Sequence, residues 1–260
     1  MSGGRCWMTP KQFIRGIAIK GFNVAKAIIA PDTKFPDNRL YIKSYSQYGE
    51  DLLVDAILGC KPTGTYVDIG ANDPTLFSNT KRFYERGWMG INIEPNPLHF
   101  PVLLKNRTRD VNLNIGISDK ESTLPFYILK ADMVSTLDKK TAIRNCQDFD
   151  TSIQKVIDIP VARLDTTLET FLGRRIIDFM SIDVEGAEML VLRGNDWKKY
   201  RPHVILIEIQ DHTEVIMDYL TTKNYLPIMS NGTNAIFIDR ATSLDVNLIN
   251  NEVPNGLGDK

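Results

Sequence analysis

The chain has few cysteines, and none are spaced for metal or redox chemistry. Its three cysteines, Cys6, Cys60 and Cys146, stand far apart in 260 residues. The C-x-x-C pairs of zinc sites and dithiol enzymes are therefore absent, and so small and odd a set argues against a disulfide framework. This usage is typical of a reducing compartment, so we expect a cytoplasmic protein.

Long apolar runs and an excess of charge are also absent. No apolar run reaches the roughly 18 to 20 residues that a membrane-spanning helix needs, and the N-terminus lacks the apolar core and cleavage site of a signal peptide. The 31 basic and 32 acidic residues give a formal net charge of −1, which does not favour nucleic acid as a partner. The length suits one α/β domain with a small appendage.

The two ends of the chain differ from its middle. Residues 11–29 carry four basic side chains among apolar ones, as a basic amphipathic helix would. Such a helix would either rest on an anionic membrane surface or pack on the domain or a second subunit, and Gly16 and Gly21 favour packing because they weaken a free-standing helix. We therefore expect an N-terminal helix and linker (1–43), a main domain (44–242) and a C-terminal tail (243–260).

Predicted strands and helices alternate along the main domain. Strands are expected at 65–69, 88–94, 111–117, 159–164, 177–183 and 203–210, with helices at 74–86 and 97–106 between the first three. This alternation predicts a parallel sheet with right-handed crossovers and helices on both faces. The last two strands, 225–229 and 234–239, are joined by a short Asn-Gly loop, which predicts an antiparallel hairpin at the C-terminal end.

Residues 120–160 interrupt this alternation with a short predicted strand and a polar loop. Insertions of this length commonly carry substrate recognition. Because the segment has few aromatic residues, we expect it to recognise a substrate by hydrogen bonding more than by stacking.

The stretch from Thr65 to Pro74 predicts a strand followed by a tight turn at a ligand site. Asp68 lies near the end of the strand, Gly70 can adopt a positive φ, and Asn72 tolerates the same conformation. A full G-x-G-x-x-G is absent, and an acid beside the turn would repel pyrophosphate, so a cationic or zwitterionic ligand fits better. Glu94 ends the next strand, where a carboxylate commonly receives ribose hydroxyls. A nucleoside without a 2′-phosphate is the expected ligand.

Further acidic residues follow the other strands. The carboxyl ends of parallel strands share one edge of a sheet, so these side chains should converge there. The candidates for a general base are Asp183, Glu185, Glu208 and His212. Asp183 and Glu208 could instead share a divalent cation. Gln47 and Glu50 begin a predicted helix that either covers the ligand or is simply capped.

Several motifs together resemble the FkbM family of S-adenosylmethionine-dependent methyltransferases. They are Val67-Asp-Ile-Gly-Ala-Asn72, Ile93-Glu-Pro-Asn96, Gly116-Ile-Ser-Asp119, Ser135-Thr-Leu137, Arg163-Leu-Asp165 and Ile182-Asp-Val-Glu-Gly-Ala-Glu188, preceded by Ser46-Gln-Tyr-Gly-Glu-Asp51. The resemblance covers roughly residues 44–240. Many members carry glycine at the position of Pro74 and lysine at that of Ser181. The turn here is therefore expected to be stiffer, and this chain lacks the positive charge of that lysine.

The resemblance implies a class I methyltransferase fold of seven strands and S-adenosylmethionine as cofactor. It places Gly70 and Asn72 at the methionine moiety and Ser118 and Asp119 near adenine. The expected cofactor-binding set is Gln47, Glu50, Asp68, Gly70, Asn72, Glu94, Ser118 and Asp119. Asp183 and Glu185 are expected on the acceptor side, with Glu208 and His212 as second candidates.

The family mostly methylates oxygen. The resemblance therefore implies O-methylation of a sugar hydroxyl during polysaccharide biosynthesis. Two alternatives stay open: methylation of a natural product, and a non-catalytic module that binds the cofactor.

Overall fold

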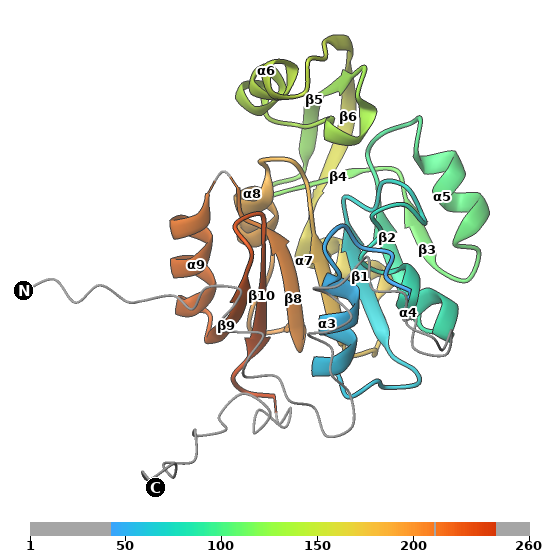
Figure 1. Cartoon of the computed structure of the whole chain (residues 1–260), viewed down its shortest axis with the longest axis vertical. Helices are drawn as coiled ribbons and strands as arrows, with labels where there is room; N and C mark the ends of the chain where they lie inside the picture. Colours follow the sequence, from blue (N-terminus) through green and yellow to red (C-terminus); the bar gives the residue numbers. More distant parts are fainter. Residues whose placement is uncertain (1–42, 211, 243–260) are drawn as a thin grey trace, which may run out of the picture. The chain divides into compact units, whose positions relative to one another are not determined.

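The structure, a computed structural model, describes residues 43–210 and 212–242 (Figure 1). The predicted amphipathic helix at 11–29 and the predicted tail at 243–260 lie outside the described residues. Within these residues, no helix combines the length and apolar character needed to cross a membrane.

Seven strands form the central sheet of the domain. Their order is β3 (Val111–Leu113), β2 (Met89–Ile93), β1 (Thr65–Ile69), β7 (Phe179–Ile182), β8 (Val204–Glu208), β10 (Asn234–Asp239) and β9 (Tyr225–Ser230). Neighbouring strands are parallel except at β10, which is antiparallel to both β8 and β9. The predicted α/β fold and its terminal hairpin are therefore confirmed.

Helices cover both faces of this sheet. On one face α7 (Leu164–Phe171), α8 (Glu188–Arg193) and α9 (Thr213–Thr222) join one large apolar core with the strands. The other face carries α3 (Glu50–Ile57) and α4 (Lys81–Arg86), and α5 (Phe100–Asn106) follows β2. There the Phe83 ring lies 4.9 Å from that of Trp88 and 5.2 Å from that of Phe179, centroid to centroid. Because side chains alternate along a strand, Asp68 and Tyr66 belong to this second face.

A second, three-stranded sheet forms what we call the cap, residues 116–163. It has the order β4 (Gly116–Ser118), β6 (Ile153–Arg163) and β5 (Ser122–Leu129), with a short helix η2 (Asp132–Val134) and α6 (Lys139–Asp148). Its own small core consists of Phe126, Ile128, Ile159 and Val161. The cap stands at the top of Figure 1, beyond the end of the central sheet.

The cap corrects two sequence predictions. The single strand expected at 111–117 is split, because the chain leaves the central sheet after Leu113 and enters the cap sheet at Gly116. The strand expected at 159–164 is the end of β6, which pairs with β5 and β4 and not with the central sheet.

The helix predicted from Pro74 begins only at Lys81. The side chain of Asp73 accepts hydrogen bonds from the backbone N–H of Thr75 and of Leu76, which favours a turn over a helix. Phe77 then adopts a left-handed φ of 55°, which stops a helix at this point. Residues 71–80 are therefore a structured loop.

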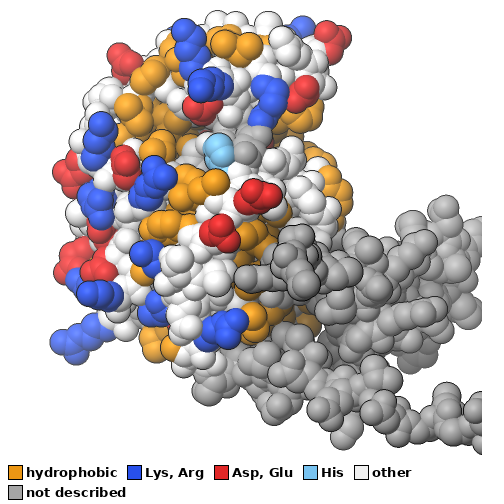
Figure 2. Space-filling view, turned by 90° about the vertical axis from the view of Figure 1, so that its left-hand side faces the viewer, with side chains coloured by type: hydrophobic (Ala, Val, Ile, Leu, Met, Phe, Trp, Pro, Cys, Tyr) orange, Lys and Arg blue, Asp and Glu red, His pale blue; other side chains and the backbone are white. Residues whose placement is uncertain are grey.

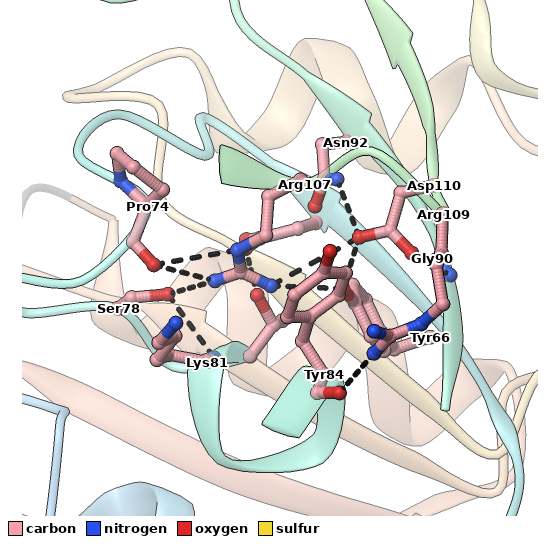
Figure 3. A network of polar contacts seen from close by, with 12 residues as sticks. Tyr66, Pro74, Ser78, Lys81, Tyr84, Gly90, Asn92, Arg107, Arg109 and Asp110 are labelled. Carbon is pink, nitrogen blue, oxygen red and sulfur yellow. Dashed lines mark hydrogen bonds and ion pairs between the residues drawn. The ribbon is translucent and has the colours of Figure 1, made fainter. Parts of the chain in front are cut away.

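The buried guanidinium of Arg107 fixes this loop from behind (Figure 3). Arg107 is 1% exposed and donates hydrogen bonds to the carbonyl of Pro74 and the hydroxyl of Ser78, each at 2.9 Å. It also donates to the hydroxyl of Tyr66 on β1, which in turn donates a short hydrogen bond to Asp110. The network therefore ties the loop after β1 to the body of the sheet.

Candidate active site

A cavity of about 400 Å³ lies where the carboxyl ends of the parallel strands meet the cap. Eight of the predicted site residues line it: Gln47, Asp68, Gly70, Asn72, Glu94, Asp183, Glu185 and Glu208. Four predicted residues, Glu50, Ser118, Asp119 and His212, are not part of the lining. The sequence therefore predicted the acidic residues of the cavity wall at the ends of β1, β2, β7 and β8, but not several other lining residues there.

The turn after β1 has the backbone conformation that its sequence predicts. Gly70 has a φ of 83° and Asn72 a φ of 45°. A Cβ on Gly70 would lie 1.7 Å from the carbonyl oxygen of Asp183, so only glycine fits here. This close approach sets the spacing between the end of β1 and the end of β7, and it places Asp68 and Asp183 at the same cavity.

Asp68 is buried and points to the face of the sheet that carries α4. Its carboxylate accepts a hydrogen bond of 2.6 Å from the Thr80 hydroxyl, and it pairs in register with Ser181 on β7. Asn79 donates to the Ser181 hydroxyl at 3.1 Å. Burial raises the pKa of Asp68 above its ordinary value, against the hydrogen bond from Thr80. Asn79 and Ser181 also line the cavity.

Glu94 is held by the backbone on either side of it. One carboxylate oxygen accepts a hydrogen bond from the N–H of Asn72 and the other from the N–H of Asn96, each at 2.7 Å. Burial raises the pKa of Glu94 to about 7, although these two hydrogen bonds favour the charged form. Each oxygen keeps a lone pair for a further donor.

Asn96 was missed by sequence reasoning as a site residue. It is 1% exposed and lines the cavity, and its side-chain Nδ2 has no hydrogen-bond partner among the described residues. Its place two residues after Glu94 was the available signal. A buried donor without a partner at a cavity wall is a contact that a ligand can satisfy.

Three carboxylates meet at the ends of β7 and β8. Asp183 follows β7, Glu208 ends β8, and Glu185 lies in the turn before α8. One carboxylate oxygen from each residue lies within 4.8 Å of those from the other two. Burial raises the pKa of each carboxyl well above its ordinary value, and the neighbouring acids raise it further. Such a cluster holds a proton or a cation between its members.

The cap holds Glu185 in this cluster. The Thr136 hydroxyl donates to the Glu185 carbonyl at 2.6 Å, and Asn145 on α6 lies 3.4 Å from the Glu185 carboxylate. Asn72 donates to the carbonyl of Met133 at 3.2 Å, which joins the cap to the turn after β1. Thr136 belongs to the predicted Ser135-Thr-Leu137 motif, whereas nothing in the sequence marked Asn145.

The four residues outside the lining have other contacts. Glu50 is 2% exposed and accepts hydrogen bonds from Asn231 and Asn234, so it ties α3 to the β9–β10 loop. Ser118 ends β4 of the cap sheet and Asp119 comes directly after it. The guanidinium of Arg163 donates a hydrogen bond of 2.7 Å to the carbonyl of Asp119.

His212 lies at the start of α9. Glu188, at the start of α8, accepts a hydrogen bond from the N–H of Gly186 at 3.0 Å, so its carboxylate supports the turn before that helix.

Comparison with known proteins identifies the family of the chain. A family model described as the methyltransferase FkbM domain matches residues 68–227, more than half of the chain. No curated protein sequence matches the chain.

Several solved structures are similar at low sequence identity. They include a TehB-like SAM-dependent methyltransferase from Corynebacterium glutamicum (10% identity, TM-score 0.41, 75% of this chain and 89% of that one). They also include a precorrin-6y C5,15-methyltransferase from Geobacter metallireducens (10% identity, TM-score 0.39, 75% and 84%) and the METTL16 methyltransferase domain (11% identity, TM-score 0.43, 76% and 68%). The chain belongs to the FkbM methyltransferases, S-adenosylmethionine-dependent enzymes with a class I, Rossmann-like fold.

Proposed function

We propose that the chain transfers a methyl group from S-adenosylmethionine to a hydroxyl oxygen of a sugar in a glycan. The observation that carries this proposal is the cluster of Asp183, Glu185 and Glu208 at the cavity. Carboxyl groups with raised pKa values take up a proton near neutral pH, as activation of a hydroxyl requires. The alternative of a natural product as acceptor shares this chemistry, so only an acceptor assay separates the two.

The cavity suits the cofactor. S-adenosylmethionine supplies an electrophilic methyl group on a sulfonium, and it carries a net positive charge that an acidic cavity attracts. Asp68, Gly70 and Asn72 would hold its methionine part, with Gln47 alongside. Glu94 would accept hydrogen bonds from the ribose hydroxyls with the lone pairs that are not used by the N–H groups of Asn72 and Asn96. The side-chain nitrogen of Asn96, which has no partner among the described residues, would donate a hydrogen bond to the cofactor.

The acceptor side rests on the carboxylate cluster. One carboxylate would take the proton from the acceptor hydroxyl while the hydroxyl oxygen forms the bond to the methyl carbon. The turn at Gly70 would keep the cofactor side of the site, at the end of β1, next to the acceptor side, at the end of β7. Positioning of the two reactants supplies much of the rate, on the order of 7–11 kcal/mol in well-oriented systems.

A divalent cation at these oxygens is the alternative means of activating the hydroxyl. Carboxylate oxygens are the ligands that Mg²⁺ and Ca²⁺ prefer, so Asp183 and Glu208, with Glu185, would hold it. A cytoplasmic location and contact of residues 11–29 with a membrane or a second subunit stay predictions of the sequence.

The test is a methyl-transfer assay with labelled S-adenosylmethionine and a panel of sugars and natural-product alcohols, with Mg²⁺ or with a chelator. Asp183→Asn should remove transfer but keep cofactor binding, whereas the matched variant Asp218→Asn, on the exposed side of α9, should keep both. Transfer to natural-product alcohols alone would refute the sugar acceptor. Cofactor binding without transfer to any acceptor would favour a non-catalytic module.

A further inference from the structure

The cavity is far more acidic than the chain as a whole. Among the described residues, its lining holds a single basic side chain, Arg144, and seven carboxylates: Asp68, Glu94, Asp132, Asp148, Asp183, Glu185 and Glu208. The chain carries a net charge of only −1, and basic and acidic side chains are intermingled on the face in Figure 2. Acidic groups are therefore concentrated at the cavity, although burial leaves several of them sharing protons near neutral pH.

The one basic side chain does not offset this charge for a ligand. The Arg144 guanidinium lies 3.6 Å from the carboxylate of Asp148 and 3.2 Å from the side-chain oxygen of Asn145. A phosphate in the cavity would need several donors and would face carboxylates of its own sign. The lining therefore disfavours an acceptor that carries phosphate.

Apolar side chains form part of the cavity wall that stays accessible to solvent. Leu76, Phe77 and Phe149 line the cavity and are 54%, 48% and 56% exposed, and we call these three residues the apolar rim. Leu76 and Phe77 come from the loop after β1, and Phe149 comes from the end of α6 in the cap. Half-exposed rings at a cavity suit a ligand with an apolar face.

The backbone of Phe77 indicates that its position is imposed. A bulky residue rarely adopts a φ of 55°, and such strain persists only where the surroundings fix the chain. The flanking residues Pro74 and Ser78 are both bound by the buried guanidinium of Arg107 (Figure 3). This network holds the Phe77 ring at the cavity instead of letting it pack into the core.

From the acidic lining and the apolar rim we infer that the acceptor is an uncharged glycoside. This inference rests on the proposed function and narrows its substrate class. A pyranose ring presents C–H groups on its faces, which stack on the rim, and a hydroxyl at its edge, which reaches the carboxylates. This stacking adds to the hydrogen bonding that the sequence of residues 120–160 predicts for the substrate.

The inference also gives the enzyme a place in a reaction sequence. Sugars are activated for transfer as phosphate esters, and glycosyl transfer releases that phosphate group. An uncharged glycoside carries the bond that glycosyl transfer forms, so it is a product of that class of reaction. In the methylation itself the hydroxyl oxygen gains the methyl carbon, the sulfur keeps the electron pair of the broken bond, and the hydroxyl proton passes to a carboxylate.

The experiment compares matched acceptors with the full chain and labelled S-adenosylmethionine. A panel of methyl hexosides is tested beside the 1-phosphates and nucleoside diphosphates of the same hexoses, with a chelator and with Mg²⁺. We expect kcat/KM to be at least about tenfold higher for the glycosides. Equal or faster transfer to the phosphorylated sugars overturns the inference but leaves the proposed function intact. Transfer to no sugar in any form overturns both.

Two variants test the two parts of the inference separately. Phe77→Asn keeps a residue that tolerates positive φ, so it should raise the KM for the glycoside by about tenfold, the scale of an aromatic contact, and leave the Kd of the cofactor unchanged. The matched control is Ile176→Asn, at a site that is 66% exposed and outside the cavity. An unchanged KM in Phe77→Asn, or an equal loss of cofactor binding, overturns the stacking role.

Asp148→Lys reverses the charge of the carboxylate that lies 3.6 Å from the Arg144 guanidinium. It should narrow the preference for glycosides over sugar phosphates, because it adds a cation and removes an anion at the cavity. A preference that does not change means that charge does not set the choice, which overturns this part.

Discussion

Replacement of Gly70 by alanine should destabilise the protein more than any conformational argument alone predicts. An alanine Cβ would lie 1.7 Å from the carbonyl oxygen of Asp183, and that backbone cannot move without shifting β7. A left-handed alanine costs about 1–2 kcal/mol, of which about 0.4–1 is returned by the lower entropy of the unfolded chain. Overpacking adds about 1–3 kcal/mol, so the total loss is about 1–5 kcal/mol.

Gly49 offers a matched control. It has a φ of 86°, close to the 83° of Gly70, but a Cβ there would meet nothing within 4 Å. Gly49→Ala should therefore show only the conformational cost. Thermal unfolding measures both variants, and a folded part of this size loses about 2–4 °C per kcal/mol. If Gly70→Ala melts no lower than Gly49→Ala, the close approach between β1 and β7 is refuted.

Three further outcomes follow from the geometry. Glu94→Ala should weaken binding of S-adenosylmethionine by about 1.5–3 kcal/mol, the scale of hydrogen bonds to a charged group; unchanged affinity in calorimetric titration would remove Glu94 from the site. Arg107→Met should lower the free energy of unfolding by about 3–5 kcal/mol, because it leaves Asp110 buried without its cation, and an unchanged melting temperature would contradict this. Burial alone would raise the pKa of Asp55, but hydrogen bonds from Arg86 and Arg82 hold this pKa below its ordinary value. The charged Asp55 therefore stabilises the folded protein above about pH 4, and this contribution is lost as the pH falls through the pKa of the folded state. Asp55→Asn should therefore be less stable than the parent at pH 7 and equal to it in strong acid, as denaturant titrations at several pH values would show.

The strand ends could be predicted from the sequence because their signals are local. Asp68, Glu94 and Glu208 each lie at or next to the end of a short apolar run, and the parallel order brings such ends to one edge of the sheet. Gly70 and Asn72 were predictable for the same reason, since few other residues adopt their backbone conformation.

The contacts of the cap were not predictable, because they depend on tertiary structure. Nothing local shows that the chain changes sheets after Leu113, so Ser118 and Asp119 were expected at the cavity that they in fact leave. Likewise Glu50 reads as a polar residue at the start of a helix, and its partners Asn231 and Asn234 lie about 180 residues further along the chain. Arg107 looks like an ordinary surface residue in the sequence, and only the structure shows that it is buried.

The order of strands in the central sheet has a consequence for synthesis of the protein. β1 pairs with β2, its near neighbour in the chain, but also with β7, whose residues leave the ribosome more than a hundred positions later. Until then β1 has one unpaired edge, and such edges are prone to wrong association. A nascent chain cannot complete its carboxylate cluster before β8 emerges. The buried Arg107 network needs only residues 66–110, so it can hold the first strands in register while the rest of the sheet is still being made.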